Sequence, residues 1–257
     1  MTCVETGRGK SQRRVCVLHL MASVRELWRY PVKSLRGERV EETLLTEAGL
    51  VGDRLVRPQS LAGRRISARQ YAGLLGLSGT TADDGTPLVN GHPWSSEEAQ
   101  ALVRKASADD IHLIEDHSRI RFDVLPVSLV TDGALAELAV DHRRLRPNIV
   151  IEGIDGLVER GWQGLELRVG DAVVGMRQVR GRCVMTTFDP DTLEQDRGVL
   201  QRIIDEYDGR FALDCYVIAP GRIAVGDPFE VLGPWTLDNE TAIRQLGGLA
   251  RPASAPA

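Results

Sequence analysis

The sequence has few cysteines, and no two of them stand close together. They are Cys3, Cys16, Cys183 and Cys215, and none belongs to a C-x-x-C pair. This spacing argues against a disulfide framework and against a zinc or iron–sulfur cluster. None of the five histidines stands in an H-E-x-x-H pattern, so they indicate no metal site either. We therefore expect the protein to work in the reducing cytoplasm.

The sequence also lacks long hydrophobic runs and an excess of basic residues. No stretch approaches the ~18 consecutive apolar residues of a membrane span. The formal net charge of the 257 residues is −4, which offers no cationic excess for a phosphate backbone. We therefore expect neither a membrane span nor nucleic-acid binding. A composition of 42% hydrophobic and 26% charged residues is typical of a folded protein with a substantial core.

The two ends of the chain show little periodicity. Residues 1–21 are polar and basic apart from an apolar patch that is too short for a secretory signal, and we expect a disordered arm. Met21 directly precedes the first strand-like segment, so an alternative is that Met21 is the natural initiator. Residues 236–257 end in small residues and prolines, and we expect a flexible tail.

Strand patterns dominate the part between these ends. Residues 23–30 and 40–45 have strand character around a loop that begins at Pro31, which predicts a hairpin. Residues 165–176 alternate apolar and polar side chains around Gly170-Asp171, which predicts a second hairpin. The same element recurs around Gly226-Asp227, where we expect another. Many strands and few helices favour an α+β, strand-rich fold with a β-barrel-like core and peripheral helices.

Capping residues and apolar spacing mark the helices. We expect a short helix capped by Ser67, and one that begins at the capping-box spacing of Ser95. Another helix begins at Thr131 or Asp132, and residues 200–207 follow helical spacing.

Cys183 is the residue best placed for chemistry. It follows a strand-like stretch, precedes the turn at Asp189-Pro190, and stands next to Arg182. An ordinary thiol is only about 3% thiolate at pH 7, so a cation or a bound metal is needed to activate it. The alternative is a buried cysteine that packs as a small hydrophobic residue, and for a lone cysteine that interpretation is favoured.

Three further segments supply hydrogen-bond donors. Residues 144–148, Arg-Leu-Arg-Pro-Asn, suit an anion or a polar heterocycle, or else form a solvated loop. Residues 33–34 and 53–54 would form a phosphate site if they converged, although each alone is more typical of a surface charge. Arginines at positions 64, 65 and 69 continue this basic cluster.

Six sequence blocks together resemble a known family. The blocks are Tyr30-Pro31-Val32-Lys33-Ser34, Gly52-Asp53-Arg54, Ser67-Ala68-Arg69-Gln70, Arg144-Leu145-Arg146-Pro147-Asn148, Arg182-Cys183 with Thr186-Thr187 and Asp189-Pro190, and Gly221 with Ile223 and Val225-Gly226-Asp227. In this order they resemble MOSC-domain proteins, and the chain is similar to the mitochondrial amidoxime-reducing component and its bacterial relatives. The resemblance implies an N-terminal MOSC β-barrel domain over residues 22–118 and a MOSC domain over 119–235, with the barrel completed across that boundary.

The resemblance implies a molybdenum cofactor, a metal bound to pterin, with Cys183 as metal ligand and catalytic residue. Soft sulfur suits molybdenum. The residues that it assigns to the cofactor are Lys33, Ser34 and Arg54 near the pterin phosphate, Arg146 and Asn148 from the second domain, Thr131 and Asp132 beside the pterin, and Arg182 next to the ligand.

The implied activity is a two-electron reduction of N-hydroxylated or N-oxide small molecules. The chain has no ferredoxin-like cysteine cluster, so we expect electrons from a separate partner such as a flavin reductase, a ferredoxin or a small haem protein. One alternative is a non-catalytic carrier of cofactor or sulfur that uses Cys183. A third interpretation is a pyridoxal-phosphate protein with Lys33 as Schiff base; it ranks last because a catalytic lysine needs a desolvated pocket and Lys33 lies in a polar turn-like segment.

Overall fold

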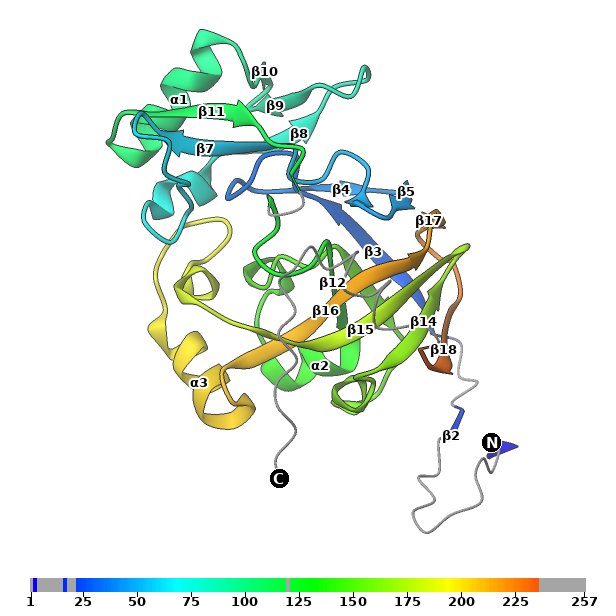
Figure 1. Cartoon of the computed structure of the whole chain (residues 1–257). Coiled ribbons are helices and arrows are strands. Elements are labelled where there is room, and N and C mark those ends of the chain that lie inside the picture. Colours follow the sequence, from blue (N-terminus) through cyan, green and yellow to red (C-terminus); the bar gives the residue numbers. More distant parts are fainter. Residues whose placement is uncertain (1, 4–15, 18–21, 119–120, 236–257) are drawn as a thin grey trace.

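The computed structural model describes residues 2–3, 16–17, 22–118 and 121–235 (Figure 1). Most of the expected arm, including Met21, and the expected tail over 236–257 lie outside the described residues. Within the arm, β1 (Thr2–Cys3) and β2 (Cys16–Val17) pair antiparallel. In the described part of the chain, no helix combines the length and the apolar character needed to cross a membrane.

An eight-stranded sheet forms the larger part of the molecule. Its strands are β3 (Ser23–Arg29), β4 (Glu38–Val40), β12 (Val127–Thr131), β13 (Ile149–Glu152), β14 (Leu165–Val169), β15 (Ala172–Gly181), β16 (Arg210–Ala219) and β18 (Phe229–Pro234). They lie in the order β18-β14-β15-β16-β12-β13-β3-β4, and β12-β13 is the parallel pair. The backbone N–H of Val24 in β3 donates to the backbone oxygen of Asp227, two residues before β18, over 2.9 Å. The sheet therefore curls round until its two sides meet, as a barrel does.

The apolar side chains of the sheet pack into two cores, one inside the barrel and one under the helices. The barrel interior contains residues from both halves of the chain, including Leu27, Leu129 and Val174. β12 is buried along its whole length, because its other face packs under α2 (Asp132–Leu138) and α3 (Arg197–Tyr207) through residues such as Val130 and Ile203. Thr131 caps α2 as expected, with its hydroxyl accepting from Ala134 N at 3.2 Å.

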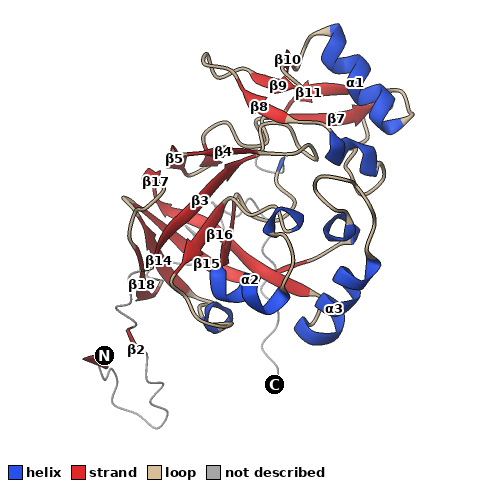
Figure 2. Ribbon diagram, turned by 180° about the vertical axis from the view of Figure 1, so that it is seen from behind, coloured by secondary structure: helices blue, strands red, loops and turns tan. Residues whose placement is uncertain are grey.

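A smaller unit lies above the barrel in Figures 1 and 2. It contains β7 (Val56–Ser60) paired with β11 (Ile111–Glu115), the meander of β8 (Gly79–Thr81), β9 (Pro87–Val89) and β10 (His92–Pro93), the helix α1 (Glu97–Ser107) and the 3-10 helix η1 (Ala72–Gly76). Its apolar residues form a core of their own. A further sheet joins β5 (Glu42–Thr46) and β6 (Gly49–Leu50) to β17 (Gly221–Ala224). The expected strand-rich α+β class is confirmed.

Of the three expected hairpins, the one around Gly170-Asp171 is confirmed, because β14 pairs with β15. The first is confirmed only in part: β3 pairs with β4 over residues 38–40, whereas most of the expected second strand, residues 40–45, belongs to β5, which pairs with β6 and β17 in another sheet. The hairpin expected around Gly226-Asp227 is wrong, because β17 pairs with β5 whereas β18 pairs with β14. The Asp227 carboxylate accepts from Ala224 N at 2.7 Å while its backbone oxygen binds Val24, so this turn sends its two strands into different sheets.

Two helix starts also differ from expectation. The apolar stretch after Ser67 is the 3-10 helix η1, which starts at Ala72 and has no side-chain cap. The Ser67 hydroxyl donates instead to Gln70 over 2.7 Å. Helix α1 is capped by Ser96, one residue later than expected, and Ser96 accepts from Ala99 N.

A candidate anion and metal site between the two units

A cavity between the barrel and the smaller unit brings together residues that are distant in sequence. The cavity is lined by Lys33, Ser34, Arg54, Ser67, Arg69, Asp123, Val124, Arg144, Leu145, Arg146, Arg180, Gly181, Arg182, Cys183, Met185 and Thr186. Six of the residues that the resemblance assigns to the metal or the cofactor are among them, namely Lys33, Ser34, Arg54, Arg146, Arg182 and Cys183. Lys33, Ser34 and Arg54 therefore line one cavity, which meets the condition of convergence on which a phosphate site from these segments depended.

Cys183 and Cys215 lie in contrasting environments. Cys215 on β16 is fully buried in the barrel core, and burial raises the pKa of its thiol. Cys183 lies two residues after the end of β15, is partly exposed, and lines the cavity. Its backbone oxygen accepts from Thr186 N at 3.0 Å and from Thr186 Oγ1 at 2.9 Å, which fixes the turn on which the thiol is presented. Cys215, rather than Cys183, is the cysteine that packs as a small hydrophobic residue.

The cation next to the Cys183 thiol is Arg69. Partial burial lowers the pKa of the Arg69 guanidinium, but its charge and hydrogen-bond interactions with Cys183 and its attraction to Asp123 outweigh burial and raise that pKa. Arg182, the neighbour in sequence, lines the same cavity, but its guanidinium donates to Phe211 O at 2.7 Å and to Leu145 O at 2.8 Å. The hydrogen bonds that Arg182 forms with described residues therefore go to backbone oxygens and not to the thiol.

Arg182 carries an unused hydrogen-bond donor. Its Nη2 is buried and has no partner among the described residues. Burial is the main reason why the pKa of its guanidinium falls to about 9. An unpaired buried donor costs about 1–3 kcal/mol unless a ligand satisfies it.

Asp123 links two cations of the cavity. Its carboxylate lies 2.8 Å from Lys33 Nζ and 3.6 Å from Arg69 Nη2. Burial alone would raise the Asp123 pKa, but these cations hold it below its ordinary value. The Lys33 ammonium also donates to Arg121 O at 2.9 Å. Asp123 was missed at the sequence level because it stands in no motif.

The environment of Lys33 corrects one expectation. Its side chain is only 12% exposed, although it was expected to lie in a polar turn-like segment, and burial lowers its pKa. The ion pair with Asp123 nevertheless favours the protonated amine. A paired ammonium is a poor nucleophile, so the Schiff-base interpretation gains no support.

Two further guanidinium groups of the cavity lie close to the ring of Tyr30. The guanidinium carbon of Arg146 lies 4.2 Å from the centre of the Tyr30 ring, and that of Arg54 lies 5.0 Å from it. Arg54 also pairs with the fully buried Asp53, which accepts from Tyr30 N at 2.8 Å. The Arg146 guanidinium forms no hydrogen bond or ion pair with any described residue, and burial lowers its pKa to about 10. Its charge is therefore free to bind an anion.

Three residues of the cavity have a strained backbone. The φ angles of Ser34, Arg54 and Arg146 are 73°, 54° and 54°, in the left-handed region that non-glycine residues rarely adopt. Such a conformation costs about 1–3 kcal/mol and is found mostly at functional sites. Local hydrogen bonds hold it in place: Ser34 Oγ accepts from Ala68 N at 3.0 Å, and Arg54 N donates to Tyr30 O at 2.8 Å.

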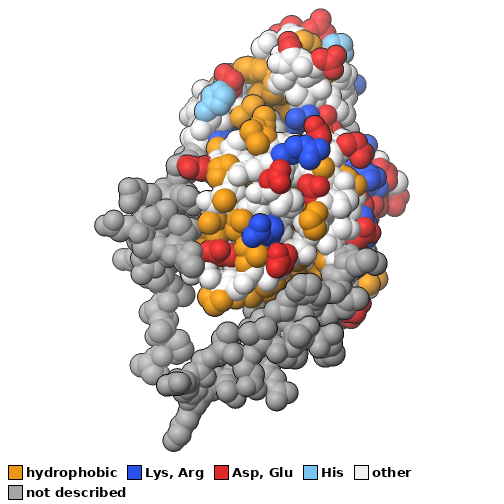
Figure 3. All heavy atoms as spheres, turned by 90° about the vertical axis from the view of Figure 1, so that its right-hand side faces the viewer, with side chains coloured by type: hydrophobic (Ala, Val, Ile, Leu, Met, Phe, Trp, Pro, Cys, Tyr) orange, Lys and Arg blue, Asp and Glu red, His pale blue; other side chains and the backbone are white. Residues whose placement is uncertain are grey.

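The cavity is strongly positive in a protein of net negative charge. Its cationic side chains are Lys33, Arg54, Arg69, Arg144, Arg146, Arg180 and Arg182. Their carboxylate partners are Asp53, Asp123, Asp189 and Asp214. More cations than carboxylates remain, so the cavity suits an anion. On another face of the molecule, by contrast, acidic, basic and hydrophobic side chains are interspersed (Figure 3).

Three residues expected at the cofactor do not line the cavity. Asn148 accepts from Ser128 N at 3.1 Å and donates to Trp28 O at 3.2 Å, which ties β12 to β3. The Asp132 carboxylate accepts from Gly153 N and Ile154 N. Thr131 is the buried cap of α2. Their side chains have structural partners, and their roles at a cofactor stay predictions.

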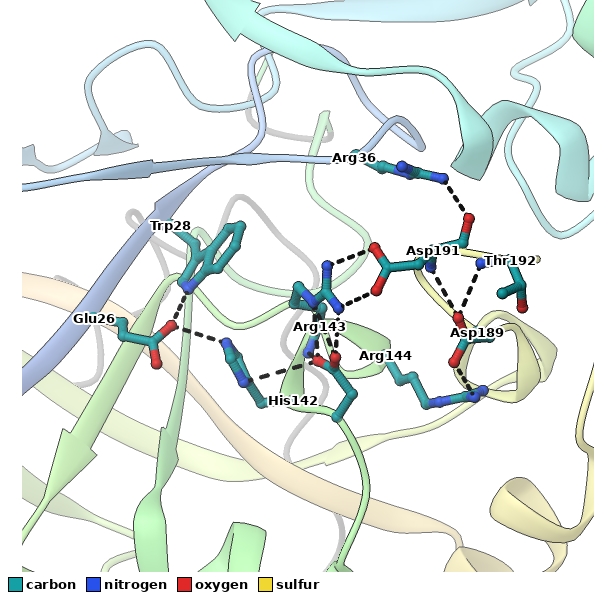
Figure 4. Close-up of polar contacts among 10 residues, drawn as sticks. Glu26, Trp28, Arg36, His142, Arg143, Arg144, Asp189, Asp191 and Thr192 are labelled. Atoms are coloured by element: carbon teal, nitrogen blue, oxygen red, sulfur yellow. Dashed lines mark hydrogen bonds and ion pairs between the residues drawn. The ribbon is translucent and has the colours of Figure 1, made fainter. Parts of the chain in front are cut away.

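A second cavity adjoins the first. It measures about 170 Å³ and is lined by Trp28, Tyr30, Arg36, Gly37, Leu75, Arg143, Arg144, Arg146, Met185, Phe188, Asp189 and Pro190. Arg144, Arg146 and Met185 line both cavities. Figure 4 shows the ion pairs at its rim, where Arg143 reaches both oxygens of Asp191 at 2.9 and 2.6 Å.

Two family models match most of the chain. The model for the MOSC domain matches residues 125–230, and the model for the MOSC N-terminal beta barrel domain matches residues 21–118. The chain is 27% identical to the human protein named mitochondrial amidoxime-reducing component 1, over 86% of each chain. It is 25% identical to bovine mitochondrial amidoxime reducing component 2, over 70% of each chain. The crystal structure of the YuaD protein from Bacillus subtilis aligns with a TM-score of 0.44 at 14% identity, over 84% of this chain and 98% of that one.

Proposed function

The chain belongs to the family of MOSC-domain proteins that carry the MOSC N-terminal beta barrel domain, and from this membership we propose that it is a molybdenum-cofactor-binding oxidoreductase. The observation that carries the proposal is Cys183, a partly exposed cysteine in a cavity with seven cationic side chains. A thiolate is a soft metal ligand, and guanidinium groups bind phosphate. This donor set suits a ligand with both a soft metal and an anionic group.

Features of the cavity itself support the fit. Arg182 Nη2 is a buried donor that lacks a partner, and Arg146 is a cation that lacks a counter-ion among the described residues. Among the described residues, no three His, Cys, Asp or Glu side chains are grouped so that they could hold a metal ion. A metal at Cys183 would therefore take its other ligands from a cofactor, as a pterin-bound metal does.

Each part of such a cofactor has candidate partners. Cys183 would be the metal ligand. Lys33, Ser34 and Arg54 would hold the phosphate, because a mostly buried ammonium, a hydroxyl and a guanidinium line the same cavity. Arg146 and Arg182 would bind the remaining polar groups with their free donors. Contacts from Thr131, Asp132 and Asn148 stay predictions.

The proposed reaction is the reduction of an N-hydroxylated or N-oxide small molecule. The relatives are named for amidoxime reduction. Two electrons and two protons cleave the N–O bond, and the oxygen leaves as water. When bound, the cofactor supplies the redox chemistry, while the side chains bind and orient the reactants. The electrons would come from a separate protein, either a flavin reductase, a ferredoxin or a small haem protein. The cytoplasmic location stays a prediction.

Metal analysis tests the proposal. Protein produced in a host that makes the cofactor should contain close to one molybdenum per chain, and Cys183→Ser should remove it. Cys215→Ala is the matched control, because Cys215 lies in the barrel core outside the cavity. Wild-type protein without molybdenum under these conditions would refute the proposal.

The second candidate function is a carrier of cofactor or sulfur. An accessible Cys183 could hold the carried group as well as it could bind a catalytic metal. Molybdenum-loaded protein and an artificial electron donor separate the two functions. An oxidoreductase reduces benzamidoxime under these conditions, whereas a carrier leaves it unchanged at full molybdenum content.

A further inference from the structure

We propose that residues 189–195 form a lid over the second cavity, and that the tip of this lid opens about a fixed base to let a ligand in. The lid connects the 3-10 helix η5 (Val184–Thr187) to α3. Its first two residues, Asp189 and Pro190, line the cavity. Access to the cavity is a property of the fold, so it does not depend on which reaction the protein catalyses.

The lid is a compact unit with hydrogen bonds of its own. Asp189 N donates to Glu194 O at 2.9 Å, and Leu193 N donates to Asp189 O at 3.0 Å. The Asp189 carboxylate accepts from Asp191 N at 2.9 Å and from Thr192 N at 3.0 Å. Both partners of each bond lie inside the lid. The bonds therefore survive a movement in which the lid turns as a rigid body.

The base of the lid is buried and fixed. The backbone oxygen of the buried Thr187 accepts from Asp196 N at 2.8 Å and from Arg144 Nη1 at 2.9 Å. The Thr187 hydroxyl accepts from Gln195 Nε2 at 3.1 Å. The largely buried Arg144 also pairs with Asp189 at 3.0 Å. Because these contacts hold both ends of the lid against the barrel, the tip moves relative to the base.

The tip of the lid is held by exposed contacts. Arg143 reaches the Asp191 carboxylate at 2.9 and 2.6 Å, and Arg36 donates to Asp191 O at 3.1 Å (Figure 4). The Asp191 side chain is 62% exposed and the Arg143 side chain 33%. Exposed ion pairs add little stability, and salt screens them. Leu193 packs against the core of the smaller unit, but its φ angle of 61° is unfavourable for a non-glycine residue.

The barrel side of this ion pair stays in place when the lid opens. The Asp141 carboxylate caps the 3-10 helix η3 (His142–Arg144) and accepts from the Arg143 guanidinium at 2.7 to 3.1 Å. His142 of the same helix lies 3.0 Å from Glu26 Oε2 on β3. Two barrel carboxylates therefore keep Arg143 in position, and Asp191 exchanges its ion pair for water. Opening leaves no buried charge without a partner, so its cost is small.

Opening of the lid exposes the wall of the cavity that the smaller unit supplies. Leu75 on η1 lines the cavity and is almost fully buried. Leu193 of the lid reaches the same helix, since a Cβ placed on Gly76 would lie 3.0 Å from Leu193 Cδ1. Leu74 is fully buried in the core of the smaller unit and does not line the cavity. Access to position 75 therefore reports opening of the lid, and access to position 74 reports unfolding of the unit.

Cysteine labelling of the full chain tests the lid. Leu75→Cys and Leu74→Cys are each treated with N-ethylmaleimide, and mass spectrometry of the peptides gives the labelling rate of the introduced thiol. We expect Asp191→Ala to speed labelling at position 75 roughly two- to fivefold and to leave position 74 unaltered, because only the tip contact is lost. A rise in NaCl from about 50 mM to about 500 mM should also speed labelling at position 75.

Two further variants complete the labelling experiment. Leu193→Ala removes the apolar contact of the tip and should speed labelling at position 75 as Asp191→Ala does. Glu206→Ala is the matched control, because it removes a similarly exposed ion pair with Arg202 on α3 and should alter neither rate. Acrylamide quenching of Trp28, obtained by difference from Trp28→Phe, gives a second measurement of access to the cavity without an introduced thiol.

Two results would overturn the lid. One is a labelling rate at position 75, or a quenching constant of Trp28, that neither Asp191→Ala nor Leu193→Ala raises. The other is equal acceleration at positions 74 and 75, which would show that the tip contacts hold the smaller unit together instead of closing the cavity. Labelling needs neither cofactor nor turnover, so failure of the lid and failure of the proposed function are seen separately.

Discussion

Arg69 reaches the Cys183 thiol from the smaller unit of the molecule, although about half of its side chain is exposed. A nearby guanidinium stabilises a thiolate, which is the reactive form of cysteine. In cofactor-free protein, we expect Arg69→Met to slow the alkylation of Cys183 by iodoacetamide roughly two- to fivefold near neutral pH. Mass spectrometry of the modified peptide over time measures this rate. Arg64→Met is the control, and equal slowing in both variants would contradict the assignment.

The strained backbone of Arg146 lowers the stability of the protein at a residue that we propose binds the cofactor. Asn tolerates the left-handed region better than Arg, and Arg146→Asn also removes a charge that burial disfavours. We expect the free energy of unfolding of the cofactor-free protein to rise by about 1 kcal/mol while molybdenum content falls. Chemical denaturation and metal analysis measure the two effects. Ala139→Asn relieves a similar left-handed conformation outside the cavity, so it should raise stability and leave the molybdenum content unchanged. A loss of stability in Arg146→Asn would argue against stored strain.

The sequence predicts that the motif residues meet at one site. It does not predict which other residues bind to them there. Lys33, Arg54 and Cys183 stand in sequence blocks that mark them as a set. Asp123 stands in no such block, and its importance arises only when folding places it between Lys33 and Arg69. The burial of Lys33 was likewise hidden, because desolvation depends on which segments pack over a side chain rather than on its neighbours in sequence.

Two similar turns show at the scale of elements why pairing is harder to predict than strands. Gly170-Asp171 closes a simple hairpin, as its alternating flanks predict. Gly226-Asp227 has similar flanks, but its backbone is bound to β3 and its strands join different sheets. Local alternation determines which face of a strand is buried. The partner of each strand depends on contacts that are distant in sequence, which alternation does not record.

The 3-10 helix η4 (Val158–Gly161) contains a buried acid that makes stability depend on pH. Glu159 is 2% exposed, and its Oε2 has no partner among the described residues. Burial raises its pKa to about 7 from an ordinary 4.5, despite opposing hydrogen bonds and the charge of Arg160. The folded state therefore favours the protonated acid, and this stabilisation is complete below pH 4.5 and lost as the pH rises through about 7.

Glu159→Gln should remove that dependence. Between about pH 5 and pH 8, we expect the unfolding free energy of the wild type to fall by on the order of 2 kcal/mol relative to the variant. Urea denaturation across this range measures the difference, with Glu137→Gln on the exposed surface of α2 as the control for loss of one acidic charge. Parallel pH profiles for the wild type and Glu159→Gln would show that Glu159 does not titrate in this range.

At the scale of the whole molecule, the two halves of the sequence are not two separable units. The hairpin of β3 and β4 comes from the first half, yet it completes the barrel by pairing with β13. The strand β17 from the second half pairs with β5 from the first. The cavity at Cys183 is lined by residues from both halves of the chain. Ligand binding at the cavity and folding of the barrel therefore both depend on the strand pairs that join the two halves of the chain.

A fragment of residues 119–235 should therefore not fold alone. It would leave β13 as an open edge and remove core residues such as Val24, Leu27, Leu45 and Leu50, which are all fully or almost fully buried. Loss of several buried aliphatic side chains, at about 2–5 kcal/mol for each large one, exceeds the stability of an ordinary domain. We expect poorly dispersed amide signals in the NMR spectrum of this fragment, and a dispersed spectrum for the fragment 22–235. A dispersed, cooperative fold for 119–235 alone would show that the barrel does not need the N-terminal strands.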